Sequence, residues 1–254
     1  MRRILPDGKG GVELVDVPLP EMMDNSVMCK QTHSLISAGT EREIIRQCSG
    51  KSVEQIQKEG IQLGYTGTGY VEDVRGNLPY TKGRKVAFYG SPYVSHSEYV
   101  AVPENLVFPL PSNVDLENGA FIGLGAISMH GFRKGGASLG DVCFIGGAGL
   151  IGNLCAQLAL IAGCRVVLSD LDEKKLELFE SECLRPGDEV RCVNPDNALR
   201  AIEEMSDGKG ADSVYLCMAT DKSAPVDQAV DVVRHGGNIV VVGVCDIHIP
   251  RHLF

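Results

Sequence analysis

The fold is decided by the stretch Val142-Cys143-Phe144-Ile145-Gly146-Gly147-Ala148-Gly149-Leu150-Ile151-Gly152. Its apolar start predicts a short buried strand, and Gly147, Gly149 and Gly152 then follow the pattern G-x-G-x-x-G. Glycine suits these positions because the first makes a tight turn, the second lets the backbone approach a pyrophosphate, and the third lets a helix pack on the strand. The amino end of that helix offers N–H groups and a positive dipole to an anion. The stretch therefore predicts a dinucleotide-binding turn, and a flexible glycine loop is the alternative.

The sequence around this turn alternates short apolar strands with amphipathic helices, which is typical of parallel βαβ units. The expected strands are 142–145, 165–169, 189–193, 213–217 and 238–242, and the expected helices are 149–162, 173–181, 198–205 and 225–233. Asp170 follows Gly147 at close to the roughly 20-residue spacing at which an acidic side chain binds the adenosine ribose hydroxyls. Its carboxylate would repel a 2′-phosphate, so we expect NAD(H). NADP(H) is less favoured, although Arg165, Lys174 and Lys175, which are near in sequence, weaken this preference.

The first hundred residues have a different texture. Their β-rich segments predict a largely antiparallel sheet and fall at 12–17, 26–32, 67–74, 84–89 and 97–102. Residues 39–59 are polar and helix-prone, with a break at 48–51. The change of texture lies near Pro111 to Leu116. We therefore expect two domains, residues 1–113 and 114–254.

Composition excludes several classes of function. The 24 basic and 33 acidic residues give a net charge of −9, and this disfavours nucleic-acid binding in the absence of a basic patch. The apolar runs are far shorter than the ~20 residues of a membrane-spanning helix, and no export signal follows Met1. Nine cysteines without a Cys-x-x-Cys pair predict reduced thiols. We expect a cytoplasmic protein that acts on a small molecule and binds neither nucleic acid nor membrane.

Four further segments carry a resemblance to a known family. They are VELVDVPLP at 12–20, LGYTGTGYV at 63–71, KGRKV at 82–86 and SEYVAVP at 97–103. With the glycine motif, they resemble the medium-chain dehydrogenase/reductase family, of the alcohol and polyol dehydrogenase type. The resemblance covers essentially the whole chain. It implies an α/β fold in which a GroES-like β-rich catalytic domain precedes a doubly wound parallel (Rossmann) sheet.

The zinc ligands of that family are replaced in this sequence. By the resemblance, the ligand cysteine becomes Ala38, the His-Glu pair becomes Tyr65-Thr66, and the third ligand becomes Leu124. Zinc binds thiolate, imidazole or carboxylate groups, which these side chains do not supply. We therefore expect no catalytic zinc. The segment Ser-Ala-Gly-Thr-Glu-Arg at 37–42 is most similar to zinc-lacking members called bi-domain oxidoreductases.

Other sources of zinc ligands are also disfavoured. Residues 90–104 contain no cysteine, so the four-cysteine structural zinc lobe of the family is missing. His248 and His252 are separated by Pro250, and they cannot share a regular helical face. The six histidines thus offer no replacement site. We expect a metal-free protein.

Without a metal, a side chain must supply the proton for hydride transfer. The resemblance places Thr40 at the position of a proton-relay hydroxyl and Tyr65 at that of a zinc-bound histidine. We therefore hypothesise that Tyr65 is the hydrogen-bond donor or acid and that Thr40 relays the proton. The alternative is that Tyr65 fills the space left by the metal. His96 is a second candidate acid, for which a structural role is the alternative.

The remaining cofactor contacts are implied by the resemblance. Ser128 would touch the nicotinamide, Ile151 would pack on the far side of its ring, and residues 242–244 would meet its carboxamide. The complete predicted cofactor set is Gly147, Gly149, Leu150, Ile151, Gly152, Asp170, Lys175, Ser128, Cys217, Val242, Gly243 and Val244.

Function follows from these expectations. Members of the family continue beyond the position of Phe254, so the sequence resembles a truncated one, and a homodimer or a further carboxyl-terminal domain is expected. The leading interpretation is a zinc-independent NAD(H)-dependent oxidoreductase that acts on an alcohol, polyol or sugar-derived carbonyl. A quinone or enone reductase is one alternative, and a catalytically inactive dinucleotide-binding module is another.

Overall fold

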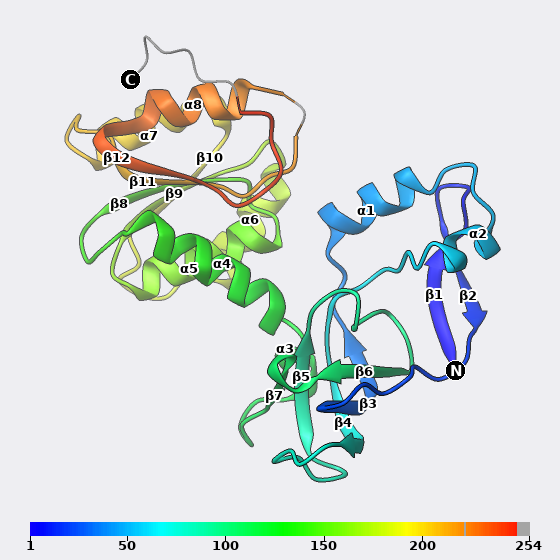
Figure 1. The fold of residues 1–254 in the computed structure, drawn as a ribbon. Coiled ribbons are helices and arrows are strands. Elements are labelled where there is room, and N and C mark those ends of the chain that lie inside the picture. The colour runs from blue at the N-terminus through cyan, green and yellow to red at the C-terminus, as the bar shows by residue number, and fades with distance from the viewer. Residues whose placement is uncertain (221, 248–254) are drawn as a thin grey trace. The chain divides into compact units, whose positions relative to one another are not determined.

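The computed structural model describes residues 1–220 and 222–247. The chain packs as two compact units, Met1–Gly123 and Leu124–Phe254 (Figure 1). The domain boundary expected from the sequence, at 113/114, lies before helix α3 (Leu116–Gly119). Among the described residues, none of the helices is both long and apolar enough to cross a bilayer.

The amino-terminal unit is built on an antiparallel sheet with the strand order β6-β3-β4-β5-β7. Its strands are β3 (Ser26–Ser34), β4 (Thr66–Arg75), β5 (Lys85–Tyr89), β6 (Tyr99–Pro103) and β7 (Val107–Pro109). A separate hairpin pairs β1 (Arg2–Pro6) with β2 (Val12–Asp16). Alternate side chains of the main sheet point inward and form an apolar core that contains Val27, Val71, Phe88 and Val100. The predicted antiparallel sheet is confirmed, whereas β1 and β7 were not expected.

Two helices lie between β3 and β4, as the polar helix-prone segment predicts. They are α1 (Ala38–Gln47) and α2 (Val53–Lys58). The predicted break between them is confirmed: Gly50 has a left-handed φ of +81°, and Ser52 begins α2 with a capping box to Gln55. A 3₁₀ turn, η1 (Glu104–Leu106), separates β6 from β7.

The carboxyl-terminal unit is a parallel sheet with the strand order β10-β9-β8-β11-β12. Its strands are β8 (Val142–Gly146), β9 (Arg165–Ser169), β10 (Val190–Val193), β11 (Ala211–Leu216) and β12 (Val233–Val241). The helices are α4 (Ile122–Gly135), α5 (Leu150–Ile161), α6 (Glu173–Glu182), α7 (Ala198–Met205) and α8 (Ala224–Val232), with a 3₁₀ turn η2 (Pro195–Asn197). This order is that of a doubly wound dinucleotide-binding sheet.

Helices cover both faces of this parallel sheet (Figure 1). Because side chains alternate along a strand, Val142 and Phe144 of β8 pack into one core with residues of α7 and α8. Cys143 and Ile145 pack into the other core with residues of α5 and α6. A strand buried on both faces explains why residues 142–145 are uniformly apolar. The predicted α/β class, with a GroES-like unit before a Rossmann sheet, is confirmed.

Strand β12 begins at Val233, earlier than the expected residue 238. The extra residues, VRHGG at 233–237, do not form an apolar run, but contacts with β11 hold them in the sheet. Arg234 Nε donates to Asp212 Oδ1 at 2.6 Å, and Val233 pairs with Ala211 across a register shift. Tertiary contacts therefore extend a strand that the local sequence pattern does not mark.

Candidate functional site

The glycine turn joins β8 to α5 at the carboxyl edge of the parallel sheet. Gly147 has a left-handed φ of +94°, which side chains adopt only under strain, and its N–H donates to Ser169 O at 2.7 Å. A Cβ added to Gly152 would lie 1.7 Å from Gly147 O, so only glycine lets the helix approach the turn this closely. The turn and packing roles expected of these two glycines match their surroundings.

Gly149 lies at the amino end of α5 and, unlike Gly147 and Gly152, is not required there by the backbone angle or by close packing. Its φ of −71° is open to any residue, and among the described atoms nothing lies within 4 Å of an added Cβ. Because glycine is the N-cap of this 12-residue helix, no side chain closes the helix end. The first N–H groups of α5 therefore have no side-chain cap at Gly149, and the helix dipole favours an anion at this end.

Asp170 directly follows β9 and reaches back to the turn. Its Oδ2 accepts from Ala148 N at 2.8 Å, and Lys175 Nζ lies 3.2 Å from its Oδ1. The Asp170 side chain is 12% exposed, whereas that of Lys175 is 45% exposed. The structure thus places Asp170 and Lys175 beside the glycine turn. The residues present fit a dinucleotide: a helix end for the pyrophosphate and a carboxylate for ribose hydroxyls.

Three other predicted cofactor residues, from two segments, lie at the same sheet edge. Cys217 N donates to Gly146 O at 2.8 Å, and the N–H groups of Val242 and Gly243 both donate to Leu216 O at 2.9 Å. A Cβ at Gly243 would lie 1.9 Å from Met218 O. The ends of β8, β11 and β12 are therefore tied together beside the turn, as expected where parallel strands end at one edge.

The other members of the predicted cofactor set differ in exposure. Ser128 on α4 is fully buried, and its hydroxyl donates to Ile151 O at 3.0 Å, so it supports the start of α5. Leu150 is 39% exposed and Val244 is 79% exposed. A hydrogen bond with Cys155 and burial raise the pKa of Cys217 well above its usual value, so its thiol stays protonated.

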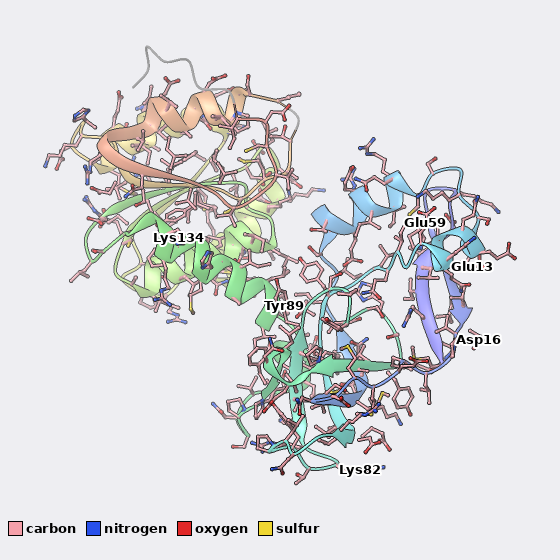
Figure 2. All side chains as sticks on the ribbon, in the orientation of Figure 1. Glu13, Asp16, Glu59, Lys82, Tyr89 and Lys134 are labelled. Atoms are coloured by element: carbon pink, nitrogen blue, oxygen red, sulfur yellow. The ribbon has the colours of Figure 1, made fainter. Side chains whose placement is uncertain are left out.

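A chain of hydroxyl groups lies in the amino-terminal unit. Tyr65 Oη donates to Ser37 Oγ at 2.6 Å, and Ser37 Oγ donates to Thr40 Oγ1 at 3.3 Å. Ser37 is buried and Thr40 is exposed. Tyr65 also packs edge-on against Tyr89 of β5, labelled in Figure 2, with their ring centroids 5.9 Å apart. The structure therefore joins Tyr65 and Thr40 through Ser37, which the sequence reasoning did not include.

His96 belongs to a second, buried arm of the same cluster. Its Nε2 lies 2.8 Å from Glu41 Oε2, and its Nδ1 lies 2.8 Å from Ser34 Oγ. The His96 and Glu41 side chains are 7% and 6% exposed. The other Glu41 oxygen, Oε1, accepts from Ser37 N at 2.7 Å. The two arms thus meet at Ser37, its hydroxyl in one and its backbone amide in the other.

A cavity of about 320 Å³ adjoins this arm. It is lined by Arg2, Ile4, Leu14, Gln31, Thr32, His33, Ser34, His96, Ser97 and Glu98. Arg2 and Glu98 form an ion pair at 2.7 Å, so their charges largely cancel.

The residues at the family's zinc-ligand positions do not fit a zinc ion. Ala38 and Leu124 carry only hydrocarbon, and the hydroxyl of Tyr65 is bonded to Ser37. Within the described ranges, 1–220 and 222–247, no group of three or more His, Cys, Asp or Glu side chains could hold a metal ion. His248 and His252, considered above as ligands, lie outside the described residues.

Sequence reasoning missed Ser34, Ser37 and Glu41. A local signal exists for two of them, because a serine at the N-cap of α1 followed by Glu41 in its first turn is close to a capping pattern. The partner of Glu41 is 55 residues away at His96. No local pattern could have joined them.

The curated proteins that match this sequence include dehydrogenases. The profile of the family described as zinc-binding dehydrogenase matches residues 151–253. Sorbitol dehydrogenase of Homo sapiens is 26% identical over 265 residues, which cover 93% of this chain and 72% of that protein. The (R,R)-butanediol dehydrogenase of Neisseria gonorrhoeae is 25% identical over 148 residues, 58% of this chain and 41% of that protein. The chain spans about two fifths of the length of the first curated relatives it matches.

Solved structures share the fold over the whole chain. The alcohol dehydrogenase TADH from Thermus sp. ATN1 has a TM-score of 0.80 at 20% identity, covering 100% of this chain and 81% of its own. Galactitol-1-phosphate dehydrogenase from Escherichia coli has a TM-score of 0.79 at 21% identity, with coverages of 100% and 79%. A GroES-like unit followed by a Rossmann unit defines a two-part dehydrogenase fold. In sequence and fold, the chain is thus similar to proteins of the medium-chain dehydrogenase/reductase family.

Proposed function

We propose that the protein is a zinc-independent, NAD(H)-dependent oxidoreductase that acts on an alcohol, polyol or sugar-derived carbonyl. The observation that carries this proposal is the hydroxyl chain from Tyr65 through Ser37 to Thr40, in which Tyr65 stands where the resemblance places a zinc-bound histidine. The glycine turn and Asp170 supply the cofactor side. The relatives named as sorbitol and butanediol dehydrogenases support the substrate class.

The nicotinamide of the bound cofactor would accept or donate the hydride. The chain's own residues must then handle the proton that accompanies it. Tyr65 Oη would hold this proton at the substrate oxygen, and Ser37 Oγ would exchange it with the Tyr65 hydroxyl. Exposed Thr40 would pass it to water. The two internal transfers, between Tyr65 and Ser37 and between Ser37 and Thr40, move a proton between oxygens that already share a hydrogen bond in the structure.

The proposal on cofactor choice depends on Asp170. Its carboxylate lies beside the glycine turn and would accept from ribose hydroxyls, while a 2′-phosphate would meet its negative charge. Lys175 offsets part of that charge, so the binding of NADPH is weakened rather than excluded. We infer a preference for NAD(H).

Turnover by the full chain tests the proposal. Purified protein is expected to change NADH absorbance with polyols or ketoses, and to keep this activity after treatment with a chelator. Tyr65→Phe is expected to lower kcat at least about tenfold with unchanged NADH binding, because it removes the proton at the substrate oxygen. Tyr70→Phe is the matched control, since Tyr70 is an exposed tyrosine on β4.

Three results would overturn the proposal. Turnover with quinones alone would favour the quinone or enone reductase. Saturable NADH binding without any turnover would favour a binding module. Loss of activity on chelation, restored by zinc, would remove the claim of zinc independence.

A further inference from the structure

The buried pair Glu41–His96 has no part in the proton path from Tyr65 to Thr40. Both side chains are more than nine-tenths buried, and Glu41 Oε2 lies 2.8 Å from His96 Nε2. A buried carboxylate costs free energy unless hydrogen bonds and a partner compensate it. Such a pair therefore needs an explanation beyond filling space.

Glu41 holds one side of the Tyr65 hydrogen bond. Its Oε1 accepts from the backbone N–H of Ser37 at 2.7 Å, and Glu41 N donates to Ser37 O at 2.9 Å. The bond to the Ser37 carbonyl is the ordinary first backbone hydrogen bond of α1, so the contribution of the Glu41 side chain is its bond to the Ser37 amide. This fixes the backbone that carries Ser37 Oγ, the atom that accepts from Tyr65 Oη.

His96 holds the other side of the same hydrogen bond. The backbone N–H of His96 donates to the carbonyl oxygen of Leu63 at 2.9 Å, and Leu63 lies two residues before Tyr65. Its ring packs on Gly64, where an added Cβ would lie 2.8 Å from Nδ1 and where φ is +84°. The imidazole is oriented by Ser34 Oγ at 2.8 Å. The backbone immediately before Tyr65 is therefore held against the imidazole that contacts Glu41.

The geometry points to Glu41 as a positioning residue: through His96, it clamps the segment of Ser37 to the segment of Tyr65 and so sets the distance between their hydroxyls. This inference deepens the proposed function and rests on it. Glu41 does not relay the proton itself, because its link to Ser37 is a peptide N–H. It acts by holding two hydroxyls that must stay within hydrogen-bond distance, where small displacements are costly in rate.

Three variants of the full chain test this inference. Glu41→Ala removes the clamp, whereas Glu41→Gln keeps an oxygen for Ser37 N and an amide for His96. Glu43→Gln is the matched control, because Glu43 lies on the same helix but bonds only to the exposed side chains of Arg46 and Gln47 among the described residues. The measurements are kcat, NADH binding and the NMR signal of ¹³Cζ-labelled Tyr65, assigned with Tyr65→Phe.

Glu41→Ala is expected to lower kcat about tenfold or more and to shift the Tyr65 signal, with NADH binding unchanged. Glu41→Gln is expected to stay within about threefold of the parent kcat and to keep the Tyr65 signal, because its hydrogen bonds persist. Glu43→Gln is expected to match the parent in all three measurements. A folded Glu41→Ala protein with the parent kcat and Tyr65 signal would overturn the inference, as would equal effects of Glu41→Ala and Glu43→Gln.

The design separates this inference from the proposed function. If the parent protein turns over no substrate, the proposed function fails, while the Tyr65 signal still decides whether Glu41 positions Tyr65. If Glu41→Ala does not fold, Glu41→Asp takes its place. The shorter side chain cannot reach Ser37 and His96 together, so the same Tyr65 shift is expected, and an unchanged signal and kcat would overturn the inference.

Discussion

The two candidate sites consist of different kinds of chemical group. The nucleotide site is made mainly of backbone groups and of the absence of side chains, within residues 142–152 and Asp170. The hydroxyl cluster is made of side chains from segments far apart in sequence, which meet at Ser37. A site of backbone groups is specified by one contiguous motif, whereas a site of side chains exists only after the sheet has folded.

The two sites should therefore also fail in different ways. In the glycine turn, an added carbon has no room at Gly152 but has open space at Gly149, so substitutions act through a clash at the first position and through the space left for a ligand at the second. In the hydroxyl cluster, substitutions act through lost hydrogen bonds, because each group has a defined partner. The expected effects below follow that distinction.

The largest effect is expected for Gly152→Ala. The new Cβ would lie 1.7 Å from Gly147 O, so either the turn or helix α5 must move. We expect the free energy of unfolding of the carboxyl-terminal unit to fall by about 3 kcal/mol. Denaturant titration measures this loss, and NADH fluorescence should show weaker binding. Parent-like stability and affinity would mean that the turn does not depend on this close approach.

A smaller effect on binding alone is expected for Gly149→Ala. This position has ordinary backbone angles and, within the described structure, open space around an added Cβ. Stability should therefore change by less than about 0.5 kcal/mol. The Kd for NADH should rise about tenfold, because the methyl group would stand where a pyrophosphate approaches the backbone. An unchanged Kd in NADH titration would place the pyrophosphate elsewhere.

The comparison also explains what the sequence could predict. The parallel sheet and the glycine turn follow from local patterns, since residues 142–145 are apolar and the glycines have fixed spacing. The full extent of β12 could not be predicted, because Arg234 joins the sheet through Asp212. The partnership of Glu41 with His96 could not be predicted either, since it depends on how the loop before β6 meets the first turn of α1.

Asp170→Asn tests the one carboxylate that we propose for the nucleotide site. The amide oxygen can still accept from Ala148 N, so the turn should persist, while the negative charge is removed. We expect the preference for NADH over NADPH to fall about tenfold, which corresponds to about 1.4 kcal/mol. The ratio of the two Kd values measures this. Lys175→Met is the companion variant and should weaken NADPH without weakening NADH, because it removes the cation that offsets Asp170.

The smallest of these effects is expected for a substitution of Asp212. This residue of the parallel sheet, like the groups of the hydroxyl cluster, acts through hydrogen bonds with defined partners. Burial raises the pKa of Asp212, but hydrogen bonds from Val142 N and Arg234 outweigh it and hold the pKa below its usual value. Its stabilisation is therefore present above the unfolded-state pKa of about 3.9 and is lost as the pH falls through the lower folded-state value. Asp212→Asn should cost about 1 kcal/mol at neutral pH, because it removes the charge from these hydrogen bonds. Denaturant titrations at neutral pH and near pH 3 should show this difference shrinking on acidification.

Glu182→Gln, at an exposed helix end, should change stability little at either pH. A pH-independent cost at Asp212 would show that packing, and not charge, joins β8 to β12.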